Sequence, residues 1–194
     1  MLVIGKVFNL LQNRGYLLPS ERAWHASLIE SIAREMGSFS YLEIGIYRGE
    51  TLRKVSKYAS LSVGVDIDTM AIKSISRLSN VETLHGTIDD ILKSDFLPKV
   101  YDLIFIDADH RKESVIHDFS VAKQILSRNG IILLHDTWPK DEIYTSFNFC
   151  GDAYKAVSAL RDIHTDFSFV TLPIHPGLTI CQSNKSLPFP LEDK

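Results

Sequence analysis

The sequence predicts an α/β fold in which helices pack around a mostly parallel, doubly wound sheet that ends in an antiparallel hairpin. Short apolar and β-branched runs bounded by turn residues alternate with segments of helical periodicity, a pattern typical of helices around a parallel sheet. Five such units follow one another along the chain. After them, two strand-like runs are broken by His-Pro-Gly at 175–177, which favours a closing hairpin over another crossover.

The individual elements follow in a regular order. Residues 19–37 predict a first helix, because Pro19 and Ser20 are helix start signals and Gly37 ends the apolar periodicity. Strands are expected at 40–45, 61–67, 81–86, 101–108 and 130–136, with helices between them at 49–59, 69–78, 88–94 and 111–127, and then a helix at 151–163 and a hairpin at 167–182.

The bulk composition is that of an ordinary globular chain. Hydrophobic residues make up 45% of the 194 residues and charged residues 23%, so neither disorder nor a fibrous protein is favoured. The formal net charge of -3 gives no basic field for nucleic acid, and no block of Lys and Arg suggests a membrane surface. A small-molecule partner is the better expectation.

The length predicts one domain at 19–184, with an N-terminal arm at 1–18 and a C-terminal tail at 185–194. The arm is apolar but too short to span a bilayer, and it lacks the basic start and the cleavage site of a signal peptide. We expect it to dock on the body of the protein or on a second subunit, which would make a homodimer. The two cysteines have no C-x-x-C spacing, which indicates reduced thiols and a cytoplasmic location.

Polar residues close each predicted parallel strand. In open α/β sheets, ligands bind outside the carboxyl ends of the strands, so these residues form the candidate site. They are Glu43 and Gly45, then Asp66, then His85 and Gly86, then Asp107, Asp109 and His110, and finally His135 and Asp136. One edge of the sheet is therefore expected to collect five acids and three imidazoles.

The stretch YLEIGIYRGETL at 41–52 joins the first strand to a helix through two glycines. Gly45 and Gly49 allow a sharp turn and a close approach of the backbone to a ligand, beside the free amides of a helix start. Asp66 closes the next strand, where a carboxylate can bind the hydroxyls of a ribose. The spacing E-x-G-x-x-x-G differs from the G-x-G-x-x-G of dinucleotide sites, and Glu43 suits a cationic amine better than a diphosphate. These features indicate a nucleoside ligand with a positive charge.

The same stretch resembles motif I of class I S-adenosylmethionine-dependent methyltransferases, and the resemblance covers residues 38–138 and the hairpin. In detail it is most similar to metal-dependent O-methyltransferases of the catechol and caffeoyl-CoA type and their relatives acting on antibiotic sugars. The resemblance implies a Rossmann-like sheet of order 3-2-1-4-5-7-6 and S-adenosylmethionine as cofactor. The cofactor residues that it implies are Glu43, Gly45, Ile46, Tyr47, Gly49, Thr51, Asp66, Ile67, Thr87, Ile88, Asp89 and Asp107.

Two carboxylates close neighbouring strands of the expected sheet. Asp107 and Asp136 can converge on one hard cation, which prefers oxygen ligands. The catechol-type relatives carry Asp-Asn where this chain has His135 and Asp136, and an imidazole suits Mn, Fe or Zn better than Mg. A divalent cation (Mg, Mn or Fe) bound by Asp107, His135 and Asp136 is expected. The alternative is a hydrogen-bonded pair of His135 and Asp136 that shapes the acceptor pocket without a cation.

His110 lies three residues after Asp107 at a helix start, where an imidazole can take the proton of an acceptor hydroxyl. We expect His110 and Asp107 to be the catalytic residues of methyl transfer from S-adenosylmethionine to a hydroxyl of a small molecule. The alternatives are a metal-independent methyltransferase, a non-catalytic nucleoside-binding protein and a nicotinamide-dependent dehydrogenase, which the missing dinucleotide glycines disfavour.

The remaining features have less specific interpretations. The aromatic-rich loop at 139–150 is expected either to cover the acceptor as a lid or to pack against the arm or a dimer partner. His117 is expected on the surface, and His85 and His175 as loop histidines.

Overall fold

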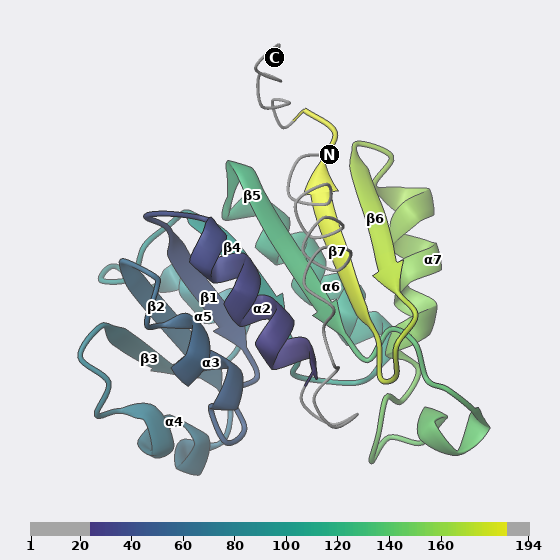
Figure 1. Ribbon diagram of the computed structural model, residues 1–194, viewed down its shortest axis with the longest axis horizontal. Coiled ribbons are helices and arrows are strands. Elements are labelled where there is room, and N and C mark those ends of the chain that lie inside the picture. The colour runs from purple at the N-terminus through teal and green to yellow at the C-terminus, as the bar shows by residue number, and fades with distance from the viewer. Residues whose placement is uncertain (1–23, 186–194) are drawn as a thin grey trace.

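The computed structural model describes residues 24–185, whose helices and strands are shown in Figure 1. They are α2 (Trp24–Glu35), β1 (Ser40–Ile44), α3 (Glu50–Val55), β2 (Leu61–Asp66), α4 (Thr69–Ile75), β3 (Val81–His85), α5 (Ile88–Lys93), β4 (Tyr101–Ile106), α6 (Lys112–Gln124), β5 (Leu126–His135), the 3-10 helix η1 (Glu142–Thr145), α7 (Ala153–Ile163), β6 (Phe167–Leu172) and β7 (Leu178–Ser183). The predicted arm at 1–18, the helix start signals Pro19 and Ser20, and all but the first residue of the predicted tail lie outside the described residues.

The seven strands form one sheet of order β3-β2-β1-β4-β5-β7-β6, which confirms the expected topology. The first five strands run parallel, whereas β7 is antiparallel to both β5 and β6. The order of winding reverses between β1 and β4, and at such a switch point ligands bind outside the carboxyl ends of the strands. The predicted site residues follow these same strand ends.

The parallel strands end one or two residues earlier than expected, and the largest difference from the expected strand boundaries is at the start of β5. β5 begins at Leu126 and not at 130, so α6 ends at Gln124 and not at 127. Leu126 pairs with Tyr101 at the start of β4, and the register then shifts before Leu103 pairs with Ile131. The residues between are Ser-Arg-Asn-Gly, whose polar side chains lack the apolar pattern by which a buried strand is recognised in a sequence.

Both faces of the sheet are buried, as is usual for parallel strands. Successive residues of a strand point to opposite faces. Along β4, Leu103 and Phe105 belong to the core under α2, α3 and α4, and Ile104 and Ile106 to the core under α5, α6 and α7. Figure 1 shows α2 and α3 in front of the sheet and α6 and α7 behind it. The helices therefore cover the faces and leave the strand ends open to a ligand.

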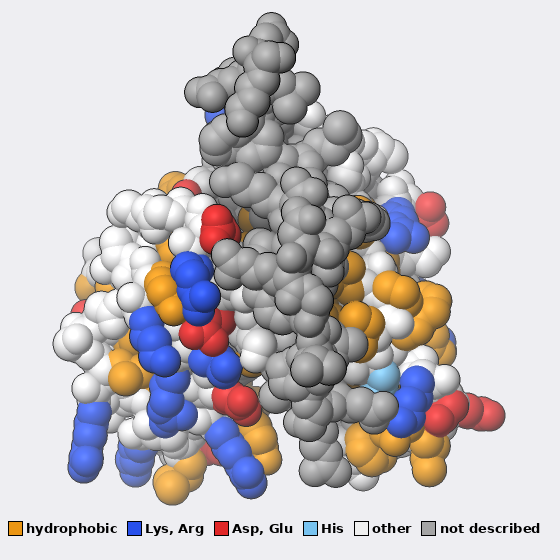
Figure 2. Space-filling model, viewed as in Figure 1, with side chains coloured by type: hydrophobic (Ala, Val, Ile, Leu, Met, Phe, Trp, Pro, Cys, Tyr) orange, Lys and Arg blue, Asp and Glu red, His pale blue; other side chains and the backbone are white. Residues whose placement is uncertain are grey.

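Basic side chains gather over α2, α3 and α4 in Figure 2. The last turn of α2 carries Arg34, that of α3 carries Arg53 and Lys54, and that of α4 carries Lys73. Positive charges at these positions interact favourably with the negative end of the helix dipole. Acidic side chains lie among them, and the Nζ of Lys54 is 3.2 Å from Glu30 Oε2. Among the described residues, no helix is long and apolar enough to cross a membrane.

Substituting Ile132→Ala tests the role of β5 in the core. Ile132 is fully buried and pairs with Ile104 of β4 and Cys181 of β7. Because the truncation leaves a cavity, we expect the free energy of unfolding in urea to fall by about 2 to 5 kcal/mol. The matched control is Ile163→Ala, since Ile163 is 60% exposed, and its expected change is within about 0.5 kcal/mol. Equal losses in the two variants would contradict this description of the core.

Candidate active site

A cavity of about 820 Å³ lies at the carboxyl ends of β1, β2, β3 and β4. This volume is in the range of small-molecule sites. Eight of the predicted cofactor residues line it: Gly45, Tyr47, Asp66, Ile67, Thr87, Ile88, Asp89 and Asp107. The predicted base His110 lines it as well, and so do His117 and Phe147. The structure thus brings most of the predicted nucleoside residues around one space.

The loop between β1 and α3 takes a backbone path that needs glycine. Gly45 and Gly49 have φ angles of 86° and 67°, and Tyr47 between them has 50°, all in the left-handed region. A Cβ on Gly45 would lie 2.2 Å from the carbonyl oxygen of Asp107, at the end of β4. The loop therefore passes directly over the end of β4, and no other residue type fits at Gly45.

Asp66 holds this loop in place. Its Oδ2 accepts hydrogen bonds from the backbone amides of Ile46 (2.7 Å) and Tyr47 (3.1 Å), and its Oδ1 accepts one from the amide of Asp68 (2.8 Å). A carboxylate can accept about four hydrogen bonds, so one acceptor position remains, on Oδ1, for a ribose hydroxyl. The sequence indicated the ribose role of Asp66 but not its second role as the anchor of the glycine loop.

Glu43 does not line the cavity. Its side chain is buried in β1 and accepts a hydrogen bond from the Tyr41 hydroxyl at 2.6 Å. Burial disfavours the carboxylate more strongly than this hydrogen bond favours it, so the pKa of Glu43 rises to about 8. Its contact with a cofactor amine stays a prediction, as do the cofactor contacts of Ile46, Gly49 and Thr51, which lie outside the cavity wall.

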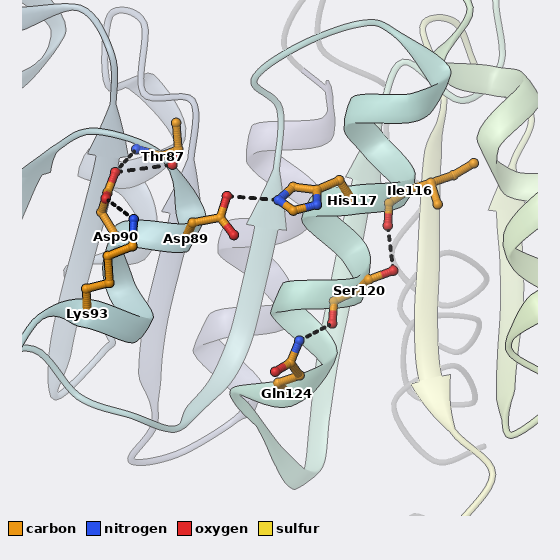
Figure 3. A network of polar contacts seen from close by, with 8 residues as sticks. All are labelled: Thr87, Asp89, Asp90, Lys93, Ile116, His117, Ser120 and Gln124. Carbon is orange, nitrogen blue, oxygen red and sulfur yellow. Dashed lines mark hydrogen bonds and ion pairs between the residues drawn. The ribbon is translucent and has the colours of Figure 1, made fainter.

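A contact between α5 and α6, shown in Figure 3, forms part of the cavity wall. Thr87 and Asp90 form a capping box at the start of α5. This start places Asp89 so that its Oδ2 lies 2.8 Å from Nε2 of His117 on α6. The side chain of His117 is 55% exposed, as expected for a surface residue, but it also forms part of the cavity wall. The hydrogen bond to Asp89 raises the pKa of His117 above 6.5.

A second group of polar side chains lies beside the cavity, on the face of the sheet that α2 covers. The alternation that turns Leu103 and Phe105 to this face continues to Asp107, and on β5 it brings His135 to the same side. The Nδ1 of His135 lies 2.9 Å from Asp107 Oδ1. Its Nε2 lies 3.2 Å from Nδ1 of His25, which the first turn of α2 supplies.

His25 was missed in the sequence. Its residue type and neighbours form no motif, and only its position four residues before the buried Ile29 places it on the inner face of the helix. In the structure its ring lies 4.1 Å from that of His135 and stacks on Phe105 at 6.2 Å between centroids. An amphipathic pattern could therefore have identified it as buried, but not as a neighbour of His135.

The two imidazoles of this group differ in charge. Burial opposes charging of His135, but Asp107 and Asp136 outweigh it and raise the pKa of His135 to about 10. Burial, together with the positive charge of His135, lowers the pKa of His25 to about 3. At neutral pH, His135 is therefore an imidazolium that His25 and Asp107 both contact.

His110 and Asp136 form the other half of the polar group. The Nε2 of His110 lies 3.1 Å from Asp136 Oδ2. Asp136 has a φ of 58°, unusual for a residue other than glycine, and its side chain is buried. Although burial favours the neutral acid, the charge of His135 lowers the pKa of Asp136. The backbone carbonyl of His110 accepts a hydrogen bond from the Asp152 amide (3.0 Å), which fixes the imidazole at the cavity edge.

The loop at 139–150 has two kinds of aromatic contact. Tyr144 packs edge-on against Phe149, with 5.2 Å between ring centroids, and its ring lies 4.2 Å from that of His175. Phe147 is 69% exposed and reaches the cavity. The loop therefore both packs on the β6–β7 turn and contributes one side chain to the site.

The described residues contain two groups that could hold a metal ion, each with ligand atoms within 4.8 Å of one another. One consists of His25, Asp107 and His135, and the other of Asp107, His110 and Asp136. The predicted ligands Asp107, His135 and Asp136 are thus divided between the groups, although Nδ1 of His135 lies 3.5 Å from Asp136 Oδ1. Carboxylate oxygens and imidazole nitrogens fit a divalent cation.

The contact between Asp89 and His117 makes a pH-dependent prediction. Because the folded-state pKa of His117 is raised, the contact stabilises the protein below the unfolded-state pKa near 6.5, and this contribution is lost as the pH rises through the folded-state pKa. In an NMR titration of the histidine ring protons, we expect Asp89→Asn to lower the pKa of His117. The exposed Asp95→Asn is the control. A pKa of His117 that is the same in all three proteins would rule out this contact.

Comparisons with known proteins agree with this geometry. A family model described as "Methyltransferase domain" matches residues 42–137, which include the glycine loop and both predicted metal-ligand segments. An uncharacterised protein of Acanthamoeba polyphaga mimivirus is 25% identical over 177 residues, which are 80% of this chain and 77% of that protein.

Solved structures share the fold. An O-methyltransferase from Bacillus cereus in complex with SAH (S-adenosylhomocysteine) has a TM-score of 0.66 and 16% identity, with 93% of this chain and 90% of that chain covered. The O-methyltransferase TomG from Streptomyces achromogenes, in complex with SAM, has a TM-score of 0.67 and 17% identity over 93% and 89% of the two chains. An SAH-bound methyltransferase of Podospora anserina has a TM-score of 0.66 and 21% identity over 93% and 87%.

Identities this low establish the shared fold, and the family match covers the part of the chain that carries the candidate site. Together they identify a methyltransferase domain at residues 42–137, in a chain whose fold is that of S-adenosylmethionine-dependent O-methyltransferases.

Proposed function

We propose that this chain transfers the methyl group of S-adenosylmethionine to a hydroxyl of a small molecule, assisted by a divalent cation. The observation that supports it most is the position of Asp107 and His110. Both residues line the cavity, and both also belong to a group of acids and imidazoles at the ends of β4 and β5. A site that only binds a nucleoside has no use for a base beside two acids.

The cofactor half of the proposal rests on the cavity wall. Asp66 offers an acceptor for the ribose, Asp89 and the start of α5 border the space for the adenine, and the glycine loop borders the methionine end. The buried Glu43 is proposed to contact the cofactor amine, although its side chain does not line the cavity. These assignments follow the family resemblance, position by position.

The acceptor half of the proposal uses His110 as the base. If Asp136 holds the imidazole through Nε2–H, the lone pair is on Nδ1, which then takes the acceptor proton. The acceptor oxygen forms a bond to the methyl carbon as the bond between that carbon and the sulfonium sulfur breaks, and a neutral thioether leaves. The protein's part is to hold oxygen, carbon and sulfur in line and to keep the proton on His110 until release.

A divalent cation in this site would be held by Asp107, His135 and Asp136. When bound, it supplies Lewis-acid assistance that makes a hydroxyl more acidic. Without it, the same three residues form the hydrogen-bonded network seen in the structure, which is the metal-independent alternative. Loss of activity in a chelator, restored by added metal, would favour the first mechanism. Activity that a chelator leaves unchanged would favour the second.

Cofactor binding is tested by titrating S-adenosylhomocysteine into the metal-free full-length chain by calorimetry. We expect saturable one-to-one binding that Asp66→Ala weakens at least about tenfold, because the variant loses the ribose acceptor and the anchor of the glycine loop. The control is Asp95→Ala, an exposed acid outside the cavity wall. If the wild-type chain releases no heat, with or without added Mg, Mn or Fe, the proposed function is wrong.

The base is tested with a hydroxylated acceptor found by screening for S-adenosylhomocysteine release. We expect His110→Ala to lower kcat by about 10² to 10⁴, because the positioned proton acceptor is gone. The control is His164→Ala, since His164 precedes β6 at the opposite edge of the sheet. Full kcat of His110→Ala at neutral pH would refute the base assignment.

A further inference from the structure

We infer that His25 is a metal ligand and that, with His135 and Asp107, it makes the site select a transition-metal ion such as Fe(II), Co(II) or Zn(II) over magnesium. This inference rests on the cation of the proposed function, and in the ligand set it replaces Asp136 by His25 of α2, which the sequence motifs do not contain. It assigns the two acid and imidazole groups different tasks. His25, His135 and Asp107 hold the ion, and Asp136 orients the base His110.

The distances fit an ion shared by the two imidazoles. His135 Nε2 and His25 Nδ1 lie 3.2 Å apart, and Asp107 Oδ1 contacts the other ring nitrogen of His135, Nδ1, at 2.9 Å. Each of the three residues has one ligand atom within 4.8 Å of those of the other two. In a tetrahedral site with metal–nitrogen bonds of about 2.0 to 2.1 Å, neighbouring ligand nitrogens are roughly 3.3 Å apart. Two ring nitrogens this close need either a proton or a cation between them, since their lone pairs repel. In the metal-free protein this is the proton of the His135 imidazolium, which a bound cation would replace.

The surroundings hold His25 in this position. Nε1 of Trp24, the preceding residue, donates a hydrogen bond of 2.8 Å to the carbonyl oxygen of His175 in the β6–β7 turn. Phe105 stacks on the ring of His25 from the sheet, and the helix itself is anchored by the buried Ile29 and Ile32. The imidazole is therefore presented to the strand ends by packing on two sides, as a preorganised ligand requires.

The chemistry of the ligands then determines which ion binds. Magnesium prefers oxygen ligands in octahedral geometry and binds imidazole weakly. Two imidazoles and one carboxylate match the set that non-haem iron and related transition-metal sites use, with further positions left for water or an acceptor. The third predicted ligand, Asp136, already contacts His110 and is free to serve it alone.

The test is a titration of Co(II) into the metal-free full-length chain, followed by visible absorption and calorimetry. We expect one Co(II) to bind, with a higher affinity than Mg. The affinity for Co(II) should be at least about 10- to 100-fold lower in His25→Ala, since a loss of this size is seen even for residues that only support a metal ligand. In His25→Cys, a thiolate-to-cobalt charge-transfer band should appear, because the sulfur would occupy the place of the ring nitrogen. The band also keeps the test valid where the truncation to alanine perturbs α2.

The matched control is His164→Gln, a histidine at the opposite edge of the sheet. Calorimetry with S-adenosylhomocysteine on the same proteins separates failure of this inference from failure of the proposed function. If Asp107→Asn weakens Co(II) binding but His25→Ala does not and His25→Cys shows no new band, His25 is not a ligand. The inference also fails if S-adenosylhomocysteine binds but Co(II) does not bind, or if Co(II) binds equally to all the variants. In either case the contacts of His25 and His135 are hydrogen bonds only.

Discussion

The site depends on one close backbone approach, between the glycine loop after β1 and the end of β4. At Gly45 the space for a Cβ is filled by the carbonyl of Asp107, while the Asp107 amide donates to the carbonyl of Ile44 at 2.8 Å. Asp107 belongs to both the cavity wall and the cluster of acids and imidazoles. One residue without a side chain therefore sets the distance between the nucleoside loop and the groups that would act on an acceptor.

The second constraint is electrostatic, because the same edge of the sheet collects several carboxyl groups that repel one another when charged. The structure stabilises each in a different way. Glu43 is buried against Tyr41, and its pKa rises to about 8, so it is largely neutral at pH 7. Asp66 accepts backbone amides, and Asp107 and Asp136 contact the positively charged His135. Glu43 is thus largely neutral, and Asp107 and Asp136 are paired with a positive charge, which reduces the negative charge where an uncharged hydroxyl would have to react.

Much of the fold could be predicted because parallel strands are buried on both faces and appear as continuous apolar runs. The order of elements and the closing hairpin followed from these runs and from the turn residues between them. The start of β5 could not, since its first residues are polar and pair across a register shift with Tyr101. In the site, the residues at strand ends were predictable because the carboxyl ends of parallel strands meet at one edge. The contact of His117 with Asp89 was not, because it joins two helix surfaces whose relative position no local pattern records.

The sequence by itself determined which residues close the strands, the glycine spacing that excludes a dinucleotide loop, and hence the kind of nucleoside site. These are local properties, set by side-chain alternation and by backbone conformations that only glycine adopts easily. The tertiary structure alone decided that His25 lies against His135, that Asp66 anchors the loop as well as facing the cavity, and that Glu43 is buried away from the cavity wall. Each of these depends on how α2 and the strands pack in three dimensions. His25 and His135 are separated by 110 positions in the sequence, and no local signal records their contact.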